Sequence, residues 1–175
     1  MRRLCARLSA SLRLPAPADP PELFSAVAGA VSELRDREVR LCFLRFPPGT
    51  VSGIWLDGDD GDLIVVEATA PPQHQLVILG HEIWHMYAGH RGGHAAGAAA
   101  ARALAPDVDL GTVVAAIAAR GDLVTEQERA AELFGIMLGS ELRPWLDARP
   151  GPGGPPEDGL AGRIQVSLGR RGVVG

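Results

Sequence analysis

Residues 81–85 read HEIWH, which places two histidines and a glutamate at the H-E-x-x-H spacing of a hydrolytic metal site. Residues four apart in an α-helix project from one face, so His81 and His85 can bind one zinc ion while Glu82 reaches a water molecule on it. Zinc lowers the pKa of that water toward about 7, and Glu82 accepts its proton as the hydroxide attacks a polarised carbonyl group. We predict His81 and His85 as metal ligands and Glu82 as the catalytic residue.

The pattern fixes only three positions and also arises by chance on helices whose histidines merely fill the surface. The surroundings favour the metal site. The apolar run QLVIL before the motif indicates a buried helix, and Gly80 leaves room beside His81.

A catalytic zinc ion takes three protein ligands and keeps one open position, so a third ligand must come from elsewhere in the chain. Glu128 and Glu132 form an E-x-x-x-E pair on one helical face. One carboxylate can bind zinc while the other accepts a hydrogen bond from a ligand histidine. We predict Glu128 as the ligand and Glu132 as the supporting or alternative ligand. The remaining alternative is that Glu126 and Glu128 only complement the dipole at the start of a helix.

The other histidines fit the ligand role less well. A different zinc pattern needs a glycine three residues and a histidine six residues after the second histidine. Those positions hold Ala88 and Arg91, so the pattern fails. We expect His90 at the end of the helix and His74 on the surface, whereas His94 lies in a glycine-rich segment.

Hydrophobic periodicity predicts the elements that position these residues. Helices are predicted over residues 1–14, 22–34, 73–89, 110–120 and 125–142, and strands over residues 38–46, 51–56 and 62–67. The sequence DGDDGD between the last two strands predicts a hairpin with a solvated turn, and it lacks the flanking helices and terminal glutamate of a calcium-binding EF-hand. Residues 92–106 are Ala/Gly-rich and are expected to form either a mobile insertion or a loosely packed helix of small side chains.

We therefore expect an α+β, zincin-like fold, in which a small antiparallel sheet of about three strands packs on a helical bundle that carries the H-E-x-x-H helix. An edge strand beside that helix would hold an extended peptide by backbone pairing.

A length of 175 residues fits one domain whose core needs no structural metal ion, so a metal is expected to serve chemistry. We expect an N-terminal helix and linker over residues 1–19, a metallopeptidase domain over 20–146 and a flexible Pro/Gly-rich tail over 147–175. The formal net charge of -4 disfavours direct binding of nucleic acid. Cys5 and Cys42 are expected as reduced, buried thiols. No segment has the pattern of a signal peptide or membrane span, so we expect a cytoplasmic protein.

Three segments resemble the ImmA/IrrE family of bacterial metallopeptidase-like proteins: IVVEA, QLVILGHEIWHMYAGH and EQERAAELFGIML. The second family motif is similar to E-x-x-A-N-x-F-A and matches residues 128–135, so Glu128 falls on the family's glutamate ligand and Glu132 on its usual Asn or Asp. The resemblance covers about residues 20–145. It implies a gluzincin-like fold and cleavage of a partner regulatory protein, commonly a helix-turn-helix repressor. It also implies a link to toxin-antitoxin pairs, in which such relatives are often the toxin component.

Three functions follow as hypotheses. The first is a cytoplasmic zinc endopeptidase that cleaves a regulatory protein. The second is a non-catalytic zinc-containing module that acts by protein binding. It is supported by the lack of an obvious group to stabilise an oxyanion, because Tyr87, the only tyrosine, is expected to face away from the metal. His94 or an arginine such as Arg91 could take that role instead. The third is a metal-free scaffold. Two histidines and a carboxylate would also hold manganese or iron, but zinc is the expected metal.

Overall fold

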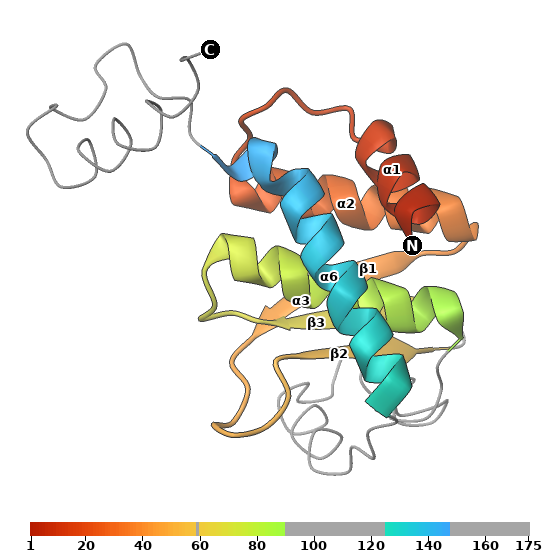
Figure 1. The fold of residues 1–175 in the computed structure, drawn as a ribbon, viewed down its shortest axis with the longest axis vertical. Helices are drawn as coiled ribbons and strands as arrows, with labels where there is room; N and C mark the ends of the chain where they lie inside the picture. Colours follow the sequence, from red (N-terminus) through yellow and green to blue (C-terminus); the bar gives the residue numbers. More distant parts are fainter. Residues whose placement is uncertain (59, 90–124, 148–175) are drawn as a thin grey trace, which may run out of the picture.

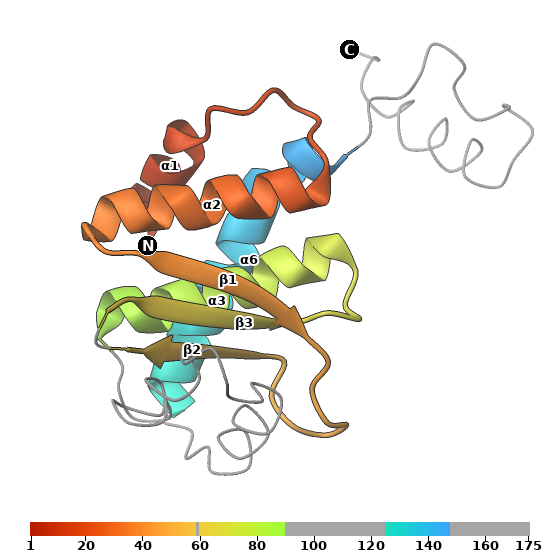
Figure 2. The same ribbon diagram turned by 180° about the vertical axis from the view of Figure 1, so that it is seen from behind.

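The computed structural model describes residues 1–58, 60–89 and 125–147. In these ranges the chain forms an α+β fold with the helices α1 (Arg2–Ser11), α2 (Pro20–Arg35), α3 (Pro72–Ala88) and α6 (Thr125–Leu146) and the strands β1 (Val39–Leu44), β2 (Gly53–Asp57) and β3 (Asp62–Glu67). Figures 1 and 2 show the sheet on one side of α3 and helix α6 crossing α3 on the other. The α+β class is confirmed, as is each predicted element within these ranges, with ends shifted by a few residues. The predicted helix over 110–120, the segment 92–106 and the tail from residue 148 lie outside the described residues.

The strands form one mixed sheet in the order β1-β3-β2. Strands β2 and β3 pair antiparallel, from Gly53 opposite Val66 to Asp57 opposite Asp62, which confirms the predicted hairpin. Strand β1 pairs with β3 in parallel, so the prediction of an antiparallel sheet is wrong for this pair. The chain reverses twice after β1, and the second strand of the hairpin therefore runs in the direction of β1 and inserts beside it. Strand β2 is left at the edge of the sheet.

Local chemistry sets both ends of α3, the helix that carries the H-E-x-x-H motif. The helix begins at Pro72, since a proline ring suits the first helical turn and needs no hydrogen bond there. It ends at Gly89, which adopts a left-handed conformation with φ of 68° and donates its N–H to the main-chain oxygen of His85. Near the helix start, the side chain of Gln75 donates to the main-chain oxygen of Glu67 at 3.1 Å. The motif is therefore fixed against the end of β3.

Helix α6 crosses α3 where both helices have glycines. A Cβ atom on Gly135 would lie 2.4 Å from the main-chain oxygen of Val77 and 3.1 Å from the main-chain nitrogen of His81. A Cβ atom on Gly80 would lie 2.8 Å from the Cα atom of Gly135. Side chains at these positions would hold the helices apart. The room beside His81 is therefore filled by α6, whose first turn comes close to the histidines.

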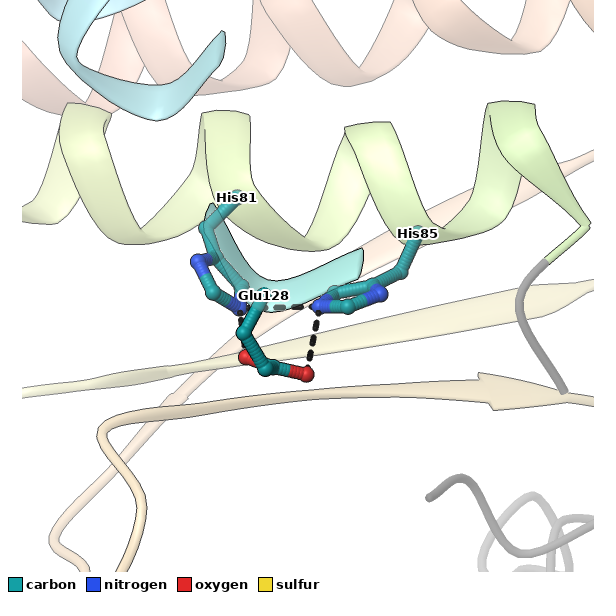
Figure 3. Close-up of side chains that lie close together, drawn as sticks. All are labelled: His81, His85 and Glu128. Atoms are coloured by element: carbon teal, nitrogen blue, oxygen red, sulfur yellow. Dashed lines mark hydrogen bonds and ion pairs between the residues drawn. The ribbon is translucent and has the colours of Figure 1, made fainter. Parts of the chain in front are cut away.

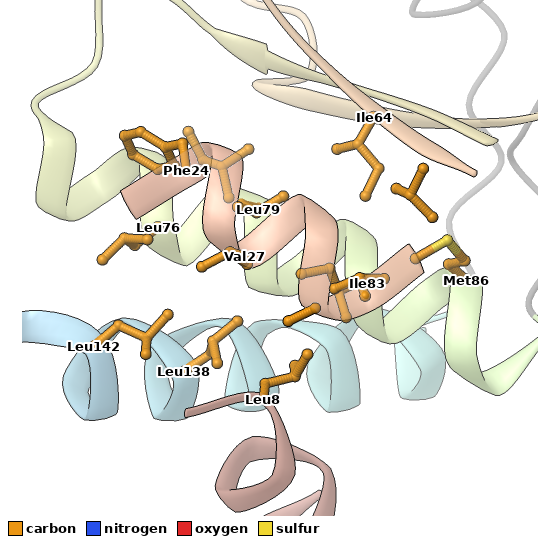
Figure 4. Close-up of a cluster of buried hydrophobic side chains, with 14 of the residues drawn as sticks. Leu8, Phe24, Val27, Ile64, Leu76, Leu79, Ile83, Met86, Leu138 and Leu142 are labelled. Carbon is orange, nitrogen blue, oxygen red and sulfur yellow. The ribbon is translucent and has the colours of Figure 1, made fainter. Parts of the chain in front are cut away.

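The hydrophobic core lies between the sheet and the helices (Figure 4). Leu76, Leu79 and Ile83 of α3 are no more than 2 % exposed. Helix α1 adds Leu4 and Leu8 to the same core. Full burial of a side chain of this size stabilises the fold by roughly 1.5–3 kcal/mol. The N-terminal residues therefore share one core with the helix that carries the motif.

Both cysteines in the described residues are free thiols, and Cys5 is buried whereas Cys42 is only half-buried. Burial raises the pKa of both thiols, so neither has the thiolate character of a reactive cysteine. Among the helices of the described ranges, none has the length and apolar character required to cross a membrane.

Candidate metal centre

His81, His85 and Glu128 lie together where the middle of α3 meets the first turn of α6 (Figure 3). The Nε2 atoms of His81 and His85 are 2.9 Å apart. Oε2 of Glu128 lies 3.3 Å from Nε2 of His81, and Oε1 lies 3.3 Å from Nε2 of His85. Because one potential ligand atom of each residue lies within 4.8 Å of the others, the group could hold a metal ion.

The separations fit a single small cation. A zinc ion bound tetrahedrally at about 2.0–2.2 Å holds neighbouring ligand atoms about 3.3–3.6 Å apart. Both histidine–glutamate distances, at 3.3 Å, fall at the edge of this range. The histidine–histidine distance of 2.9 Å is somewhat shorter and equals that of a hydrogen bond. Two imidazoles and one carboxylate are a known donor set of catalytic zinc sites, which keep a fourth position for water.

The cluster has a buried side and an open side. The side chain of His85 is 3 % exposed, whereas those of His81 and Glu128 are 22 % and 26 % exposed. Glu128 also lies in the first turn of α6, where a carboxylate complements the positive end of the helix dipole. The dipole interpretation of this residue and the ligand interpretation are therefore compatible, because the same position serves both.

Burial favours the neutral form of His81. Burial lowers the pKa of His81, while the charges of Glu128 and Glu132 oppose this shift. A neutral imidazole is the state that coordinates a metal ion. Glu132 is exposed and lies outside the group of three, although its charge reaches His81. Its supporting or alternative role stays a prediction.

Glu82 is buried between α3 and β2 and is only 4 % exposed. Burial raises the pKa of Glu82 to about 8, the charge of Glu128 adds to the rise, and a hydrogen bond from the main-chain N–H of Trp55 opposes it. Among the described residues, its Oε2 atom has no hydrogen-bond partner. An unpartnered buried polar atom destabilises a fold by about 1–3 kcal/mol. This oxygen does not stabilise the fold, and Glu82 therefore stays a candidate for a functional role.

The remaining residues considered from the sequence fall into two groups. His74 is exposed, as predicted, and Tyr87 is 58 % exposed. His90, Arg91 and His94 lie outside the described residues.

A buried polar group near the site was missed by sequence reasoning. Asp62, the last residue of DGDDGD and the first of the predicted strand over 62–67, is fully buried. Its carboxylate accepts a hydrogen bond from the indole N–H of Trp55 at 2.9 Å and pairs with Arg35 at 3.1 Å and Arg37 at 3.6 Å. These two arginines, at the end of α2 and just after it, compensate the buried charge. Arg35 also donates to the main-chain oxygen of Met86, which joins this group to α3.

No family model, no characterised protein and no solved structure matches the chain. What the site can do therefore follows from its own geometry. That geometry defines an α+β protein with a His81, His85 and Glu128 group that could hold a metal ion.

Proposed function

We propose that this chain is a zinc-dependent metallopeptidase in which His81, His85 and Glu128 hold the metal ion and Glu82 is the catalytic acid–base. The observation that carries the proposal is the convergence of three ligand atoms from two helices, at distances of 2.9 and 3.3 Å. The helix that carries both histidines also carries the buried carboxyl group of Glu82, whose pKa the charge of Glu128 raises. When bound, zinc would polarise the carbonyl group of a peptide bond and activate a water molecule.

The protein's own residues have distinct tasks in this proposal. The imidazoles of His81 and His85 and the carboxyl group of Glu128 would hold the ion. In its ionised form, which becomes more populated as pH rises toward its pKa of about 8, Glu82 would accept the proton of the attacking water on its unpartnered Oε2 atom and transfer it to the leaving amide nitrogen. Its burial would exclude bulk water from this proton transfer.

A peptide in extended conformation is the substrate that the fold favours. Strand β2 is at the sheet edge and packs beside α3, and no strand in the described ranges pairs with its outer side. The outward main-chain N–H of Trp55 already donates to Glu82 there, so a peptide would pair with the other outward main-chain groups of the strand. Extended peptides bind to such edges through main-chain hydrogen bonds. The resemblance to ImmA/IrrE proteins supports a regulatory protein, such as a helix-turn-helix repressor or antitoxin, as the natural substrate.

A non-catalytic zinc module that binds a regulator, such as the toxin component of a toxin-antitoxin pair, is the second candidate. It is favoured by Tyr87, which is 58 % exposed and so is not available beside the histidines to stabilise an oxyanion. Manganese or iron would also suit two histidines and a carboxylate, although the donor set and motif favour zinc.

Cleavage of a quenched-fluorescent peptide library by the zinc-loaded protein tests the proposal. Wild type should cleave, and Glu82→Gln should cleave about 10²–10⁴-fold more slowly while retaining zinc. Glu126→Gln, which changes an exposed acid in the first turn of α6, is the matched control and should behave as wild type. Zinc retention without cleavage of any peptide would favour the binding module.

A further inference from the structure

Gly53 begins β2 on the face of the strand that meets α3. A Cβ atom at this position would lie 2.6 Å from Cγ2 of Ile78, 2.8 Å from Oε1 of Glu82 and 3.1 Å from Cγ of Glu82. Real Cβ atoms essentially never approach another heavy atom within 3.0 Å. Any residue other than glycine would therefore displace the carboxyl group of Glu82, the side chain of Ile78 or the strand itself.

The pairing of β2 with β3 determines where the main-chain N–H of Trp55 points. The N–H of Glu67 donates to the oxygen of Ser52, its direct neighbour in the register, so the even-numbered residues of β2 bond to β3. Antiparallel strands alternate between bonded and non-bonded pairs. The N–H of Trp55 therefore points away from β3, and it donates to Glu82 on that side.

The side chain of Trp55 is held from the opposite direction. Its indole N–H donates to Oδ1 of Asp62 at 2.9 Å, and Trp55 is only 2 % exposed. Asp62 is in turn held by Arg35, whose Nε and a terminal nitrogen lie 3.2 and 3.1 Å from Oδ2. Asp62 holds the indole of Trp55, and Arg35 holds Asp62. The main chain of Trp55 therefore cannot move without breaking a buried hydrogen bond.

We infer that Gly53, Trp55 and Asp62 form a seat for Glu82, in which Gly53 and Asp62 are positioning residues. Gly53 supplies the space for the carboxyl group, Trp55 supplies the hydrogen bond, and Asp62 fixes Trp55. The importance of the seat for catalysis rests on the proposed function, whereas the location of the carboxyl group does not. The seat holds one oxygen of Glu82 and leaves Oε2 for proton transfer.

The main-chain amide signal of Trp55 in ¹H–¹⁵N NMR spectra of the full chain reports on the seat, because an N–H bonded to a carboxylate resonates downfield. Glu82→Ala should move this signal upfield, and Gly53→Ala should reproduce most of that shift while the protein still binds zinc. Gly29→Ala is the matched control, since a Cβ atom there meets nothing within 4 Å, and it should leave the signal in place. A Trp55 amide that stays at its wild-type position in Gly53→Ala or in Glu82→Ala would overturn the inference.

Asp62→Asn gives a second test that stands even if Gly53→Ala fails to fold. Both the indole and the main-chain N–H signals of Trp55 should shift in this variant. A shift confined to the indole signal would show that Asp62 stabilises the fold without positioning Glu82. These measurements need no substrate, so a wild-type protein that cleaves nothing would defeat the proposed function and leave the seat intact.

Discussion

Oε2 of Glu128 lies 3.3 Å from Nε2 of His81, and the two residues belong to different helices. The contact depends on the carboxylate itself and on the close approach of α6 to α3 at Gly135. Metal binding should therefore be sensitive to both, and separate substitutions can test each.

Glu128→Gln should weaken zinc affinity by at least about 100-fold, because loss of a partner that merely supports a ligand already costs about 10–100-fold. Glu132→Gln should weaken it by about 10-fold or less, since that side chain is exposed and lies outside the group of three. Competition against a chromophoric chelator measures both constants. A larger loss in Glu132→Gln would transfer the ligand role to that residue.

Gly135→Ala should destabilise the protein by about 1–3 kcal/mol, because its Cβ atom would lie 2.4 Å from the main-chain oxygen of Val77, and main chain cannot move aside as a side chain can. Gly29→Ala is the same chemical change at an exposed helical position and should stabilise by up to about 1 kcal/mol. Urea denaturation of the metal-free proteins gives both values. Equal stability of the two variants would mean that α6 does not approach α3 at Gly135.

Asp62→Ala should destabilise the fold by about 3–5 kcal/mol, since it removes the carboxylate that compensates Arg35 and Arg37. The control is Asp147→Ala, because Asp147 pairs with Arg143 on the surface, where such pairs contribute only about 0–1 kcal/mol. Urea midpoints compare the two variants. A loss in Asp62→Ala as small as that of the control would contradict the buried ion pair.

Because of Glu67, the stability of the fold should depend on pH in the acidic range. Partial burial raises the pKa of Glu67, but hydrogen bonds from the main-chain N–H groups of Thr69 and Phe46 and the hydroxyl group of Thr69 outweigh it and hold the pKa below its ordinary value. Because the folded-state pKa is depressed, this stabilisation is present above the unfolded pKa of about 4.3 and is lost as pH falls through the folded value.

The difference in melting temperature between wild type and Glu67→Gln isolates this contribution from other acids. It should be largest near neutral pH and shrink as pH falls below about 4. A difference that stays constant from neutral pH into acid would show that Glu67 carries no depressed pKa.

Most helices and strands could be predicted from the sequence, because the hydrophobic periodicity of a helix or a strand can be recognised within a few residues. The motif on α3 and the hairpin of β2 and β3 are examples of this kind. The parallel pairing of β1 with β3 could not be predicted in this way, since strand direction depends on how the chain returns over the sheet. For the same reason the burial of Asp62 could not be foreseen: its partners Arg35 and Arg37 meet it only in the folded chain.

The metal-ligand group could likewise be predicted only in part from the sequence. Helical spacing alone places His81 and His85 on one face, but it cannot choose between Glu128 and Glu132, which lie one turn apart on α6. The choice depends on where α6 crosses α3. A partial signal exists in Gly135 and Gly139, which are four residues apart and mark a helix face able to approach a neighbour closely.

The metal content of the purified protein, measured by mass spectrometry, tests the central claim most directly. Wild type and Glu82→Gln should each carry about one zinc ion per chain, and His81→Ala and Glu128→Ala should lose it, because a catalytic zinc site needs its three protein ligands. Wild type without stoichiometric metal, even after incubation with zinc, would contradict the metal centre and leave His81, His85 and Glu128 as a polar cluster of a scaffold protein.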